Sequence, residues 1–324
     1  MEYYIAWWNL ENLFDVFDSS ERPEWLQSKL NRELENWDED VLKTKIMQLA
    51  SIISLMNEGK GPDLLGVCEV ESKTVLEKLI AEIDLPGRSY SIVHSETKDA
   101  RGIDVAFIYD SKLFKKPRKK DVFSHVVLKR NATRDIVQVN FKTTSALKSD
   151  LVVIGNHWPS KLGGDLESEP YRIIAAETLS YWIERISSKF EQEVAIIVMG
   201  DFNDEPFNRS IMDYALGQKD SSIVKSKRAR KPYLFNLMWS LQKDNSGTHY
   251  WDGWGMLDQI LVNRPLLRSE GSLSLVADSC QIFRVPAMLK SDKPRRFGRP
   301  SKIKTFDLKG FSDHLPITVK IKEF

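Results

Sequence analysis

The sequence has little cysteine and no long apolar run. Its 324 residues include only two cysteines, Cys68 and Cys280, too few for a disulfide framework or a cysteine-based zinc site. No apolar stretch approaches the roughly 18 residues of a membrane-spanning helix. The start of the chain, MEYYIAWWNLENLFD, has no basic region and places Asn9 and Glu11 where a secretory signal needs apolar residues. These absences predict a cytoplasmic protein without a membrane span.

The net charge is also small, but the basic residues are concentrated. The chain has 47 Lys and Arg against 46 Asp and Glu, a formal charge of +1. Eighteen of the 47 basic residues lie in the segments 112–120, 225–231 and 289–304, so the rest of the chain is strongly acidic. Segments of this kind can bind the phosphates of nucleic acid, although they are equally typical of solvated surface loops.

Short apolar runs, many rich in Val and Ile, alternate with a few helical patterns. Helices are expected at 41–57, after an N-cap at Ser72, and from about Ser168 to Lys189. The expected strands are 3–8, 63–70, 90–94, 103–109, 122–128, 135–141, 151–157, 194–199, 257–262, 273–276, 280–284 and 315–321. Twelve strands with helices between them predict two packed sheets covered by helices. No repeat or linker is visible, so residues 1–324 are expected to form one domain.

Acidic, amide and imidazole side chains gather where these strands begin or end. The segments are WWNLENLFD (7–15), GVCEVES (66–72), GNHWPSK (155–161), MGDFNDEP (199–206) and FSDHLPI (311–317), with LDQILVN (257–263) as a weaker sixth. Taken singly, each segment is more typical of a turn or helix cap than of a catalytic site. Their joint occurrence at strand ends, which are rigid mounts for side chains, favours a site.

These residue types suit the hydrolysis of a phosphoester. That reaction uses a hard cation such as Mg²⁺ held by carboxylate and amide oxygens, a base for water, and donors to the phosphoryl oxygens. Imidazole serves as base or as charged donor near neutral pH. The candidates for these tasks are Glu69, Asp201, Asn9, Asn203, His157 and His314.

The order of the motifs resembles the endonuclease/exonuclease/phosphatase superfamily. The series WNLEN, CEVE, RGIDVAFIYD, NHWPSK, GDFNDEP, LDQILV and SDHLPI extends from Asn9 to His314 and so covers nearly the whole chain. That group includes deoxyribonuclease-type nucleases, apurinic/apyrimidinic endonucleases, inositol polyphosphate 5-phosphatases and neutral sphingomyelinases. The resemblance implies an α+β fold, a four-layer α/β/β/α sandwich of two packed, mainly antiparallel sheets. It also implies a Mg²⁺ cofactor, for which Mn²⁺ can substitute.

The resemblance assigns metal and phosphate roles. Glu69 looks like the principal Mg²⁺ ligand, with Asn9 beside it, and Asp313 resembles an acid near a second metal position. Asp201 and Asn203 resemble the pair that orients the nucleophile and binds phosphate.

Two histidine–carboxylate pairs follow from the same comparison. Asp258 is similar to the acid that hydrogen-bonds the catalytic histidine, here His314. His157 resembles the second histidine, which stabilises the phosphoryl oxygens, and Asp104 falls where the family often places its carboxylate partner. A carboxylate beside imidazole favours its charged form and fixes its tautomer.

Nucleic acid is the favoured substrate, with DNA preferred over RNA. The NHWPSK segment resembles that of bacterial nucleases, and the basic segment 289–304 directly precedes FSDH. Glu71 departs from the basic residue that such nucleases carry two places after the metal-binding Glu. Cleavage of a small or lipid phosphoester stays open, as does an inactive binding protein; the oligomeric state is not determined, although a monomer is compatible with the sequence. The expected substrate-binding residues are Arg101, Asn156, Ser160, Lys161, Trp251, Trp254, Arg295 and Arg296.

Overall fold

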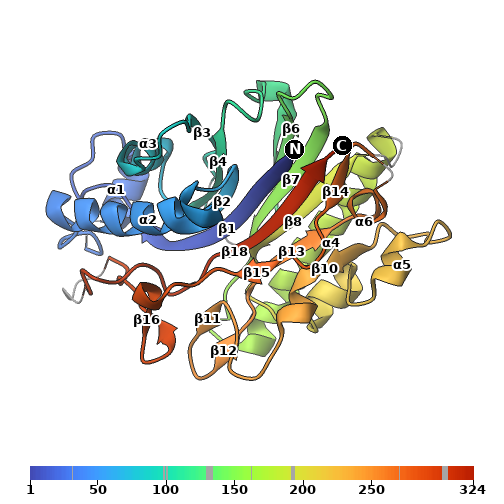
Figure 1. Ribbon diagram of the computed structural model, residues 1–324. Helices are drawn as coiled ribbons and strands as arrows, with labels where there is room; N and C mark the ends of the chain where they lie inside the picture. Colours follow the sequence, from blue (N-terminus) through green and yellow to red (C-terminus); the bar gives the residue numbers. More distant parts are fainter. Residues whose placement is uncertain are drawn as a thin grey trace.

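Two large β-sheets pack face to face, and helices cover their outer faces (Figure 1). The computed structural model describes residues 1–30, 32–97, 99, 101–128, 134–161, 163–190, 194–269, 271–300 and 306–324. Within these residues no helix is both long and apolar enough to cross a membrane.

The first sheet has the order β14-β18-β1-β2-β4-β3, and β15 also pairs with β18. The β1–β2 pair is parallel and the other pairs are antiparallel. Its strands are β1 (Glu2–Leu13), β2 (Leu64–Val70), β3 (Tyr90–His94), β4 (Asp104–Asp110), β14 (Leu273–Leu275), β15 (Gln281–Ile282) and β18 (Ile317–Glu323).

The second sheet has the order β5-β6-β7-β8-β13-β10-β9, with only β7–β8 and β9–β10 parallel. Its strands are β5 (Val122–His125), β6 (Ile136–Lys142), β7 (Asp150–His157), β8 (Ala195–Asp201), β9 (Gly217–Gln218), β10 (Leu234–Asn236) and β13 (Asp258–Val262). Two small hairpins stand apart from the sheets: β11 (His249–Tyr250) with β12 (Trp254–Gly255), and β16 (Leu289–Lys290) with β17 (Lys293–Pro294).

Side chains cap the first turns of the two helices at Glu39–Gly59 and Lys73–Glu82, and of these two caps the one at Ser72 was predicted. The side chain of Asp38 accepts a hydrogen bond from the third residue of α2, and Ser72 does the same for α3. The α-helices are α1 (Glu24–Leu30), α2 (Glu39–Gly59), α3 (Lys73–Glu82), α4 (Asp165–Lys189), α5 (Ser221–Lys225) and α6 (Arg264–Arg268). Short 3₁₀ or π turns lie at Lys119–Asp121, Ser210–Tyr214, Leu237–Leu241 and Pro286–Met288.

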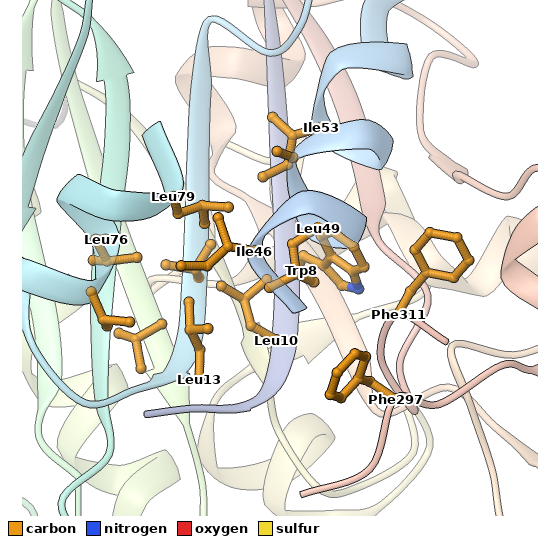
Figure 2. Packing of buried hydrophobic residues seen from close by; sticks show 14 of the residues in the cluster. Trp8, Leu10, Leu13, Ile46, Leu49, Ile53, Leu76, Leu79, Phe297 and Phe311 are labelled. Atoms are coloured by element: carbon orange, nitrogen blue, oxygen red, sulfur yellow. The ribbon is translucent and has the colours of Figure 1, made fainter. Parts of the chain in front are cut away.

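Strand alternation divides the core into three layers. Along β1, Trp7 points between the sheets, whereas Trp8 points to the layer formed by α2 and α3. Figure 2 shows Trp8, Leu10 and Leu13 of β1 beneath side chains of both helices. The opposite face of the second sheet packs on α4 in the same way. Three apolar layers between four structural ones confirm the predicted four-layer sandwich of mainly antiparallel sheets.

The twelve predicted strands are all present, and the third helix begins three residues earlier than expected, at Asp165.

The topology also sets where the motifs meet. The parallel pairs β1–β2 and β7–β8 end at one edge of the sandwich, and the antiparallel strands β4, β13 and β18 begin there. All the motif-bearing strand ends therefore converge on this edge.

Candidate active site

A cleft of about 440 Å³ opens where these strand ends meet. It is large enough for a phosphate with part of the group that it esterifies. Eleven of the predicted site residues line it, and they come from seven separate segments of the chain: Glu69, Arg101, His157, Ser160, Lys161, Asp201, Asn203, Trp251, Arg296, Asp313 and His314.

Bulges in neighbouring strands present Glu69 to the cleft. The register of β2 against β4 shifts between Cys68 and Val70, and Glu69 at that point has a φ of 61°. A left-handed backbone at a non-glycine residue costs roughly 1 kcal/mol or more and is common at functional sites. The irregularity in β1 lies alongside, and the backbone N–H of Asn12 donates to Glu69 Oε2 at 3.0 Å. The carboxylate is thus held at the cleft surface rather than within the sheet.

His314 is oriented by Asp258, as the sequence predicts. The His314 Nδ1 atom lies 2.6 Å from Asp258 Oδ2, and Trp7 Nε1 donates to Asp258 Oδ1 at 3.2 Å. Burial acts to lower the pKa of His314, but the negative charges of Asp258 and Asp201 outweigh it and raise that pKa well above its usual value. The Nε2 atom of His314 is left facing the cleft, 3.9 Å from Asp201 Oδ2.

Asp201 lies between the two histidines. Its Oδ1 accepts from the backbone N–H of Asn203 at 3.0 Å, and its Oδ2 accepts from Asn9 Nδ2 at 3.1 Å. Burial raises the pKa of Asp201 to about 7; the Asp258 charge acts in the same direction, and His314 opposes both. Such a crowded, buried carboxylate is expected beside a site for a cation.

His157 lies against the same carboxylates but lacks the predicted partner. Its Nε2 is 3.5 Å from Glu69 Oε1 and 3.7 Å from Asp201 Oδ2, while its buried Nδ1 has no hydrogen-bond partner among the described residues. Burial, with the positive charges of Arg134 and Arg101, holds the pKa of His157 well below its usual value. These surroundings disfavour the protonated ring, whereas a carboxylate partner would have favoured it.

The predicted Asp104–His157 pair is wrong. Asp104 instead accepts hydrogen bonds from Thr97, and its Oδ2 lies 3.0 Å from His94 Nε2. The reason is the β3–β4 register, which places His94 opposite Ala106 and thus diagonally within reach of Asp104 on the same face.

The oxygen donors on the cleft floor fit a divalent cation. Glu69, Asp201 and Asp313 bring three carboxylates to one hollow. Asn9 contacts Asp201, but its own Oδ1 accepts the backbone N–H of Glu11 at 2.9 Å. Asp201, Asp258 and His314 also offer ligand atoms within 4.8 Å of one another. Asp258 is fully buried between His314 and Trp7, whereas Glu69 and Asp201 line the cleft, so Glu69 and Asp201 are the better ligands.

Three predicted substrate contacts do not reach the cleft. Asn156 is buried, and its side chain bonds Trp158 Nε1 and the Met199 carbonyl, because neighbours on a strand face opposite sides and His157 takes the cleft side. Trp254 is half-buried and packs on the helix-side core. Arg295 forms a two-pronged ion pair with Asp307, at 2.9 and 3.0 Å.

Four lining residues were not predicted: Asn12, His249, Leu257 and Arg299. His249 forms a backbone bridge with His314, and their ring centroids are 4.6 Å apart. Burial and the charge of His314 lower the pKa of His249 to about 4. The segment HYWDGWGMLDQ contains this residue, but only its tryptophans stood out. The unexpected Glu71 is structural, since it pairs with buried Arg22.

Only one of the three basic segments reaches the cleft. The described part of the third segment, residues 289–300, contributes Arg296 and Arg299. Residues of 225–231 line a separate hollow beside α4, and those of 112–120 line another beside the start of β7, opposite the end that carries His157. Among the described residues, the basic segment that precedes FSDH is therefore the one that contributes to the cleft.

Comparisons with known proteins agree with this arrangement. Residues 4–323 match the profile of the endonuclease/exonuclease/phosphatase family. No curated relative matches the sequence. Among solved structures, a Bacteroides thetaiotaomicron mannosyl-6-phosphatase is similar with a TM-score of 0.56 and 14% identity over 99% of both chains.

Two further structures have the same fold. The human Nocturnin catalytic domain with bound sulfate gives a TM-score of 0.55 and 13% identity over 100% of this chain and 95% of that one. D. rerio TDP2 complexed with single strand DNA product gives 0.55 and 10% over 99% of both chains. At such low identity these likenesses concern the fold alone.

Proposed function

Because the chain belongs to the endonuclease/exonuclease/phosphatase family, whose members hydrolyse phosphoesters, we propose that it is a Mg²⁺-dependent phosphodiesterase that cleaves nucleic acid. DNA is preferred over RNA, and Mn²⁺ can substitute for Mg²⁺. The observation that carries the proposal is the meeting of Glu69, Asp201 and the Asp258–His314 pair in one cleft. The match over residues 4–323 further supports a single domain spanning residues 1–324.

Glu69 and Asp201 are the proposed metal ligands, with Asn9 beside them and Asp313 near a second position. Their hard oxygen atoms suit Mg²⁺ better than a softer metal. When bound, the cation supplies positive charge to the phosphoryl oxygens. Burial raises the pKa of Asp201 first and the charges of Asp258 and Glu69 add to this effect, so a cation held by these carboxylates would favour the ionised form of Asp201.

The residues around the metal ligands divide the remaining tasks. Asp258 fixes the His314 tautomer, so that Nε2 faces the cleft and exchanges a proton with the attacking water or donates to the phosphoryl group. Asp201 and Asn203 orient the attacking water, and His157 contributes a hydrogen bond from Nε2 to the phosphoryl oxygens. All these groups are present, which argues against an inactive binding protein.

The cleft walls favour a long polyanion over a small phosphoester. Arg101, Lys161, Arg296 and Arg299 are exposed or half-exposed at its surface. Trp251 is 68% exposed beside them, and an exposed indole suits stacking on a base. Ser160 adds a hydroxyl group. A sugar phosphate or lipid headgroup would use the same floor but needs fewer of these wall residues.

A substrate panel tests the proposal. Plasmid, single-stranded DNA, RNA, abasic duplex, an inositol phosphate, sphingomyelin and mannose 6-phosphate are incubated with Mg²⁺ and with wild type or His314→Ala. We expect cleavage of DNA that the chelator EDTA abolishes and that His314→Ala slows by roughly 10² or more. Turnover confined to the sugar or lipid phosphates would replace the nuclease assignment with the alternative, a phosphatase or phosphodiesterase that acts on a small or lipid phosphoester.

A further inference from the structure

Glu11 is a buried carboxylate of the NLEN motif that does not line the cleft. It is 1% exposed, and its hydrogen bonds come from a segment about 285 residues further along the chain. The backbone N–H groups of Phe297 and Gly298 donate to Oε2 at 3.0 and 3.1 Å, and Arg296 Nε donates to Oε1 at 2.8 Å. A single carboxylate therefore holds three consecutive residues of the third basic segment.

The same segment is anchored from the opposite side. Phe297 is fully buried, with its ring centroid 6.0 Å from that of Trp37, and Figure 2 shows it beside Phe311 under the helix layer. Lys45 of α2 is also fully buried, 5.1 Å from the Phe297 ring and 3.8 Å from Glu11 Oε2. Its charge compensates that of Glu11, since an isolated buried carboxylate costs several kcal/mol.

This anchoring decides which arginine faces the cleft. Arg295 turns to Asp307, Phe297 enters the core, and Arg296 between them lines the cleft with its side chain 49% exposed. A terminal nitrogen of Arg296 lies 3.4 Å from Asp313 Oδ2. Because Glu11 accepts the Nε hydrogen, the terminal guanidinium nitrogens, one of which pairs with Asp313, are the part of Arg296 that can meet a ligand in the cleft. A held guanidinium of this kind suits two phosphate oxygens at once.

We propose that Glu11 is a positioning residue that fixes Arg296 at the cleft rim, where Arg296 binds a non-scissile phosphate of a nucleic acid strand. This inference rests on the proposed function and extends it to the substrate's flanking chain. Arg296 belongs to the wall, whereas the carboxylates and histidines of the floor act at the scissile phosphate. Since a small diester has no second phosphate, the Arg296 contact contributes to the binding of a strand and not to the turnover of a small diester.

The test compares a single-stranded DNA oligonucleotide with bis(p-nitrophenyl) phosphate. The variants are Arg296→Ala, Glu11→Gln and the double variant that carries both substitutions. Arg295→Ala is the matched control, because it removes a neighbouring arginine that lies outside the cleft. We expect Arg296→Ala to raise the KM for the oligonucleotide roughly tenfold or more, the loss of one charge-assisted contact. Glu11→Gln has a similar effect, and the double variant adds little because both act through one contact.

Binding without turnover provides the second measurement. The affinity of a labelled oligonucleotide, measured by fluorescence anisotropy in EDTA, is expected to fall by the same factor, and by more than kcat/KM falls on the small diester. If Glu11→Gln fails to fold, Gly298→Ala replaces it. Gly298 has a φ of 104°, so a side chain there strains the backbone of residues 296–298, which Glu11 holds, and leaves Glu11 itself unchanged.

The outcomes separate this inference from the function on which it rests. If wild type cleaves no nucleic acid, the proposed function fails, and this inference with it. If wild type cleaves the oligonucleotide but Arg296→Ala behaves like Arg295→Ala, the phosphate contact alone is overturned. If the Glu11 variant loses kcat equally on both substrates with KM unchanged, Glu11 is structural and its positioning role is overturned.

Discussion

Replacing Asp258 with asparagine tests the histidine–carboxylate pair with the least change in shape. Asp258 is fully buried, and its two oxygens accept from His314 Nδ1 and Trp7 Nε1. In Asp258→Asn the carboxamide oxygen can keep the bond from Trp7. The amide NH₂ then faces His314 Nδ1. Because this NH₂ is a donor, it favours the tautomer in which Nδ1 is unprotonated and the proton lies on Nε2, toward the cleft.

The expected loss follows from the single bond that is changed. A hydrogen bond to a charged group contributes roughly 1.5–3 kcal/mol, and the 2.6 Å contact is of the short, charge-assisted kind. If the whole of that contribution acts in the transition state, kcat falls roughly 10- to 150-fold. The wrong tautomer acts in the same direction, so this range is a lower bound.

The pH dependence has a defined sign. The pKa of His314 is raised in the folded protein, chiefly by Asp258 acting against burial. A raised histidine pKa gives stability that is complete below the unfolded value of about 6.5 and is lost as pH rises through the folded pKa. The difference in thermal stability between wild type and Asp258→Asn is therefore expected to be larger near pH 6 than near pH 9.

The assay is kcat across pH on the best substrate of the panel, together with thermal denaturation at both pH values. The limb of the pH–rate profile that depends on His314 should move to lower pH in the variant. Asp104→Asn is the matched control, because Asp104 is also a buried aspartate at the start of a strand and also contacts a histidine, His94. Equal losses in the two variants, with no shift of the limb in Asp258→Asn, would refute the orienting role.

Three further predictions concern other parts of the molecule. Glu69→Gln should weaken Mn²⁺ binding at least about tenfold by isothermal titration calorimetry, and unchanged affinity would remove Glu69 from the ligand set. Burial opposes the ionisation of Glu323, but surrounding hydroxyl groups hold its pKa at about 2. Glu323→Gln should therefore lower the free energy of unfolding by up to roughly 3 kcal/mol at pH 7, and this difference should disappear as pH falls from about 4.5 to 2. Trp251→Ala should raise the KM for DNA without lowering the melting temperature, whereas Trp254→Ala should destabilise the fold by roughly 1–3 kcal/mol; the reverse pattern in kinetics and melting curves would contradict both assignments.

The sequence predicted those features that depend on local pattern and on the order of motifs. Strands of the two sheets are marked by short apolar runs between breakers, and every predicted one is present. The Asp258–His314 contact was predicted because the LDQ and SDH motifs resemble those of the family, which pairs such residues. The convergence of those ends then follows from strand direction alone.

Features that depend on register or on distant backbone groups were not predictable. The choice of His94 over His157 by Asp104 follows from the β3–β4 register, and the apolar pattern does not specify this register. Side chains alternate along a strand, so Asn156 and His157 were expected to face opposite sides of the sheet. The sequence did not show which of the two faces the cleft. The hydrogen bonds of Glu11 come mostly from backbone N–H groups, which carry no sequence signal.

The cleft that holds Glu69, Asp201 and His314 is proposed to cleave nucleic acid with a divalent cation. The most direct measurement is the cleavage rate of an end-labelled DNA oligonucleotide by wild type and by His314→Ala, each with Mg²⁺ and with EDTA. We predict cleavage by wild type only when Mg²⁺ is present, and a rate lower by roughly 10² or more in the variant. Cleavage by His314→Ala at the wild-type rate would exclude His314 from the mechanism, and cleavage by wild type at the same rate in EDTA would exclude the divalent cation.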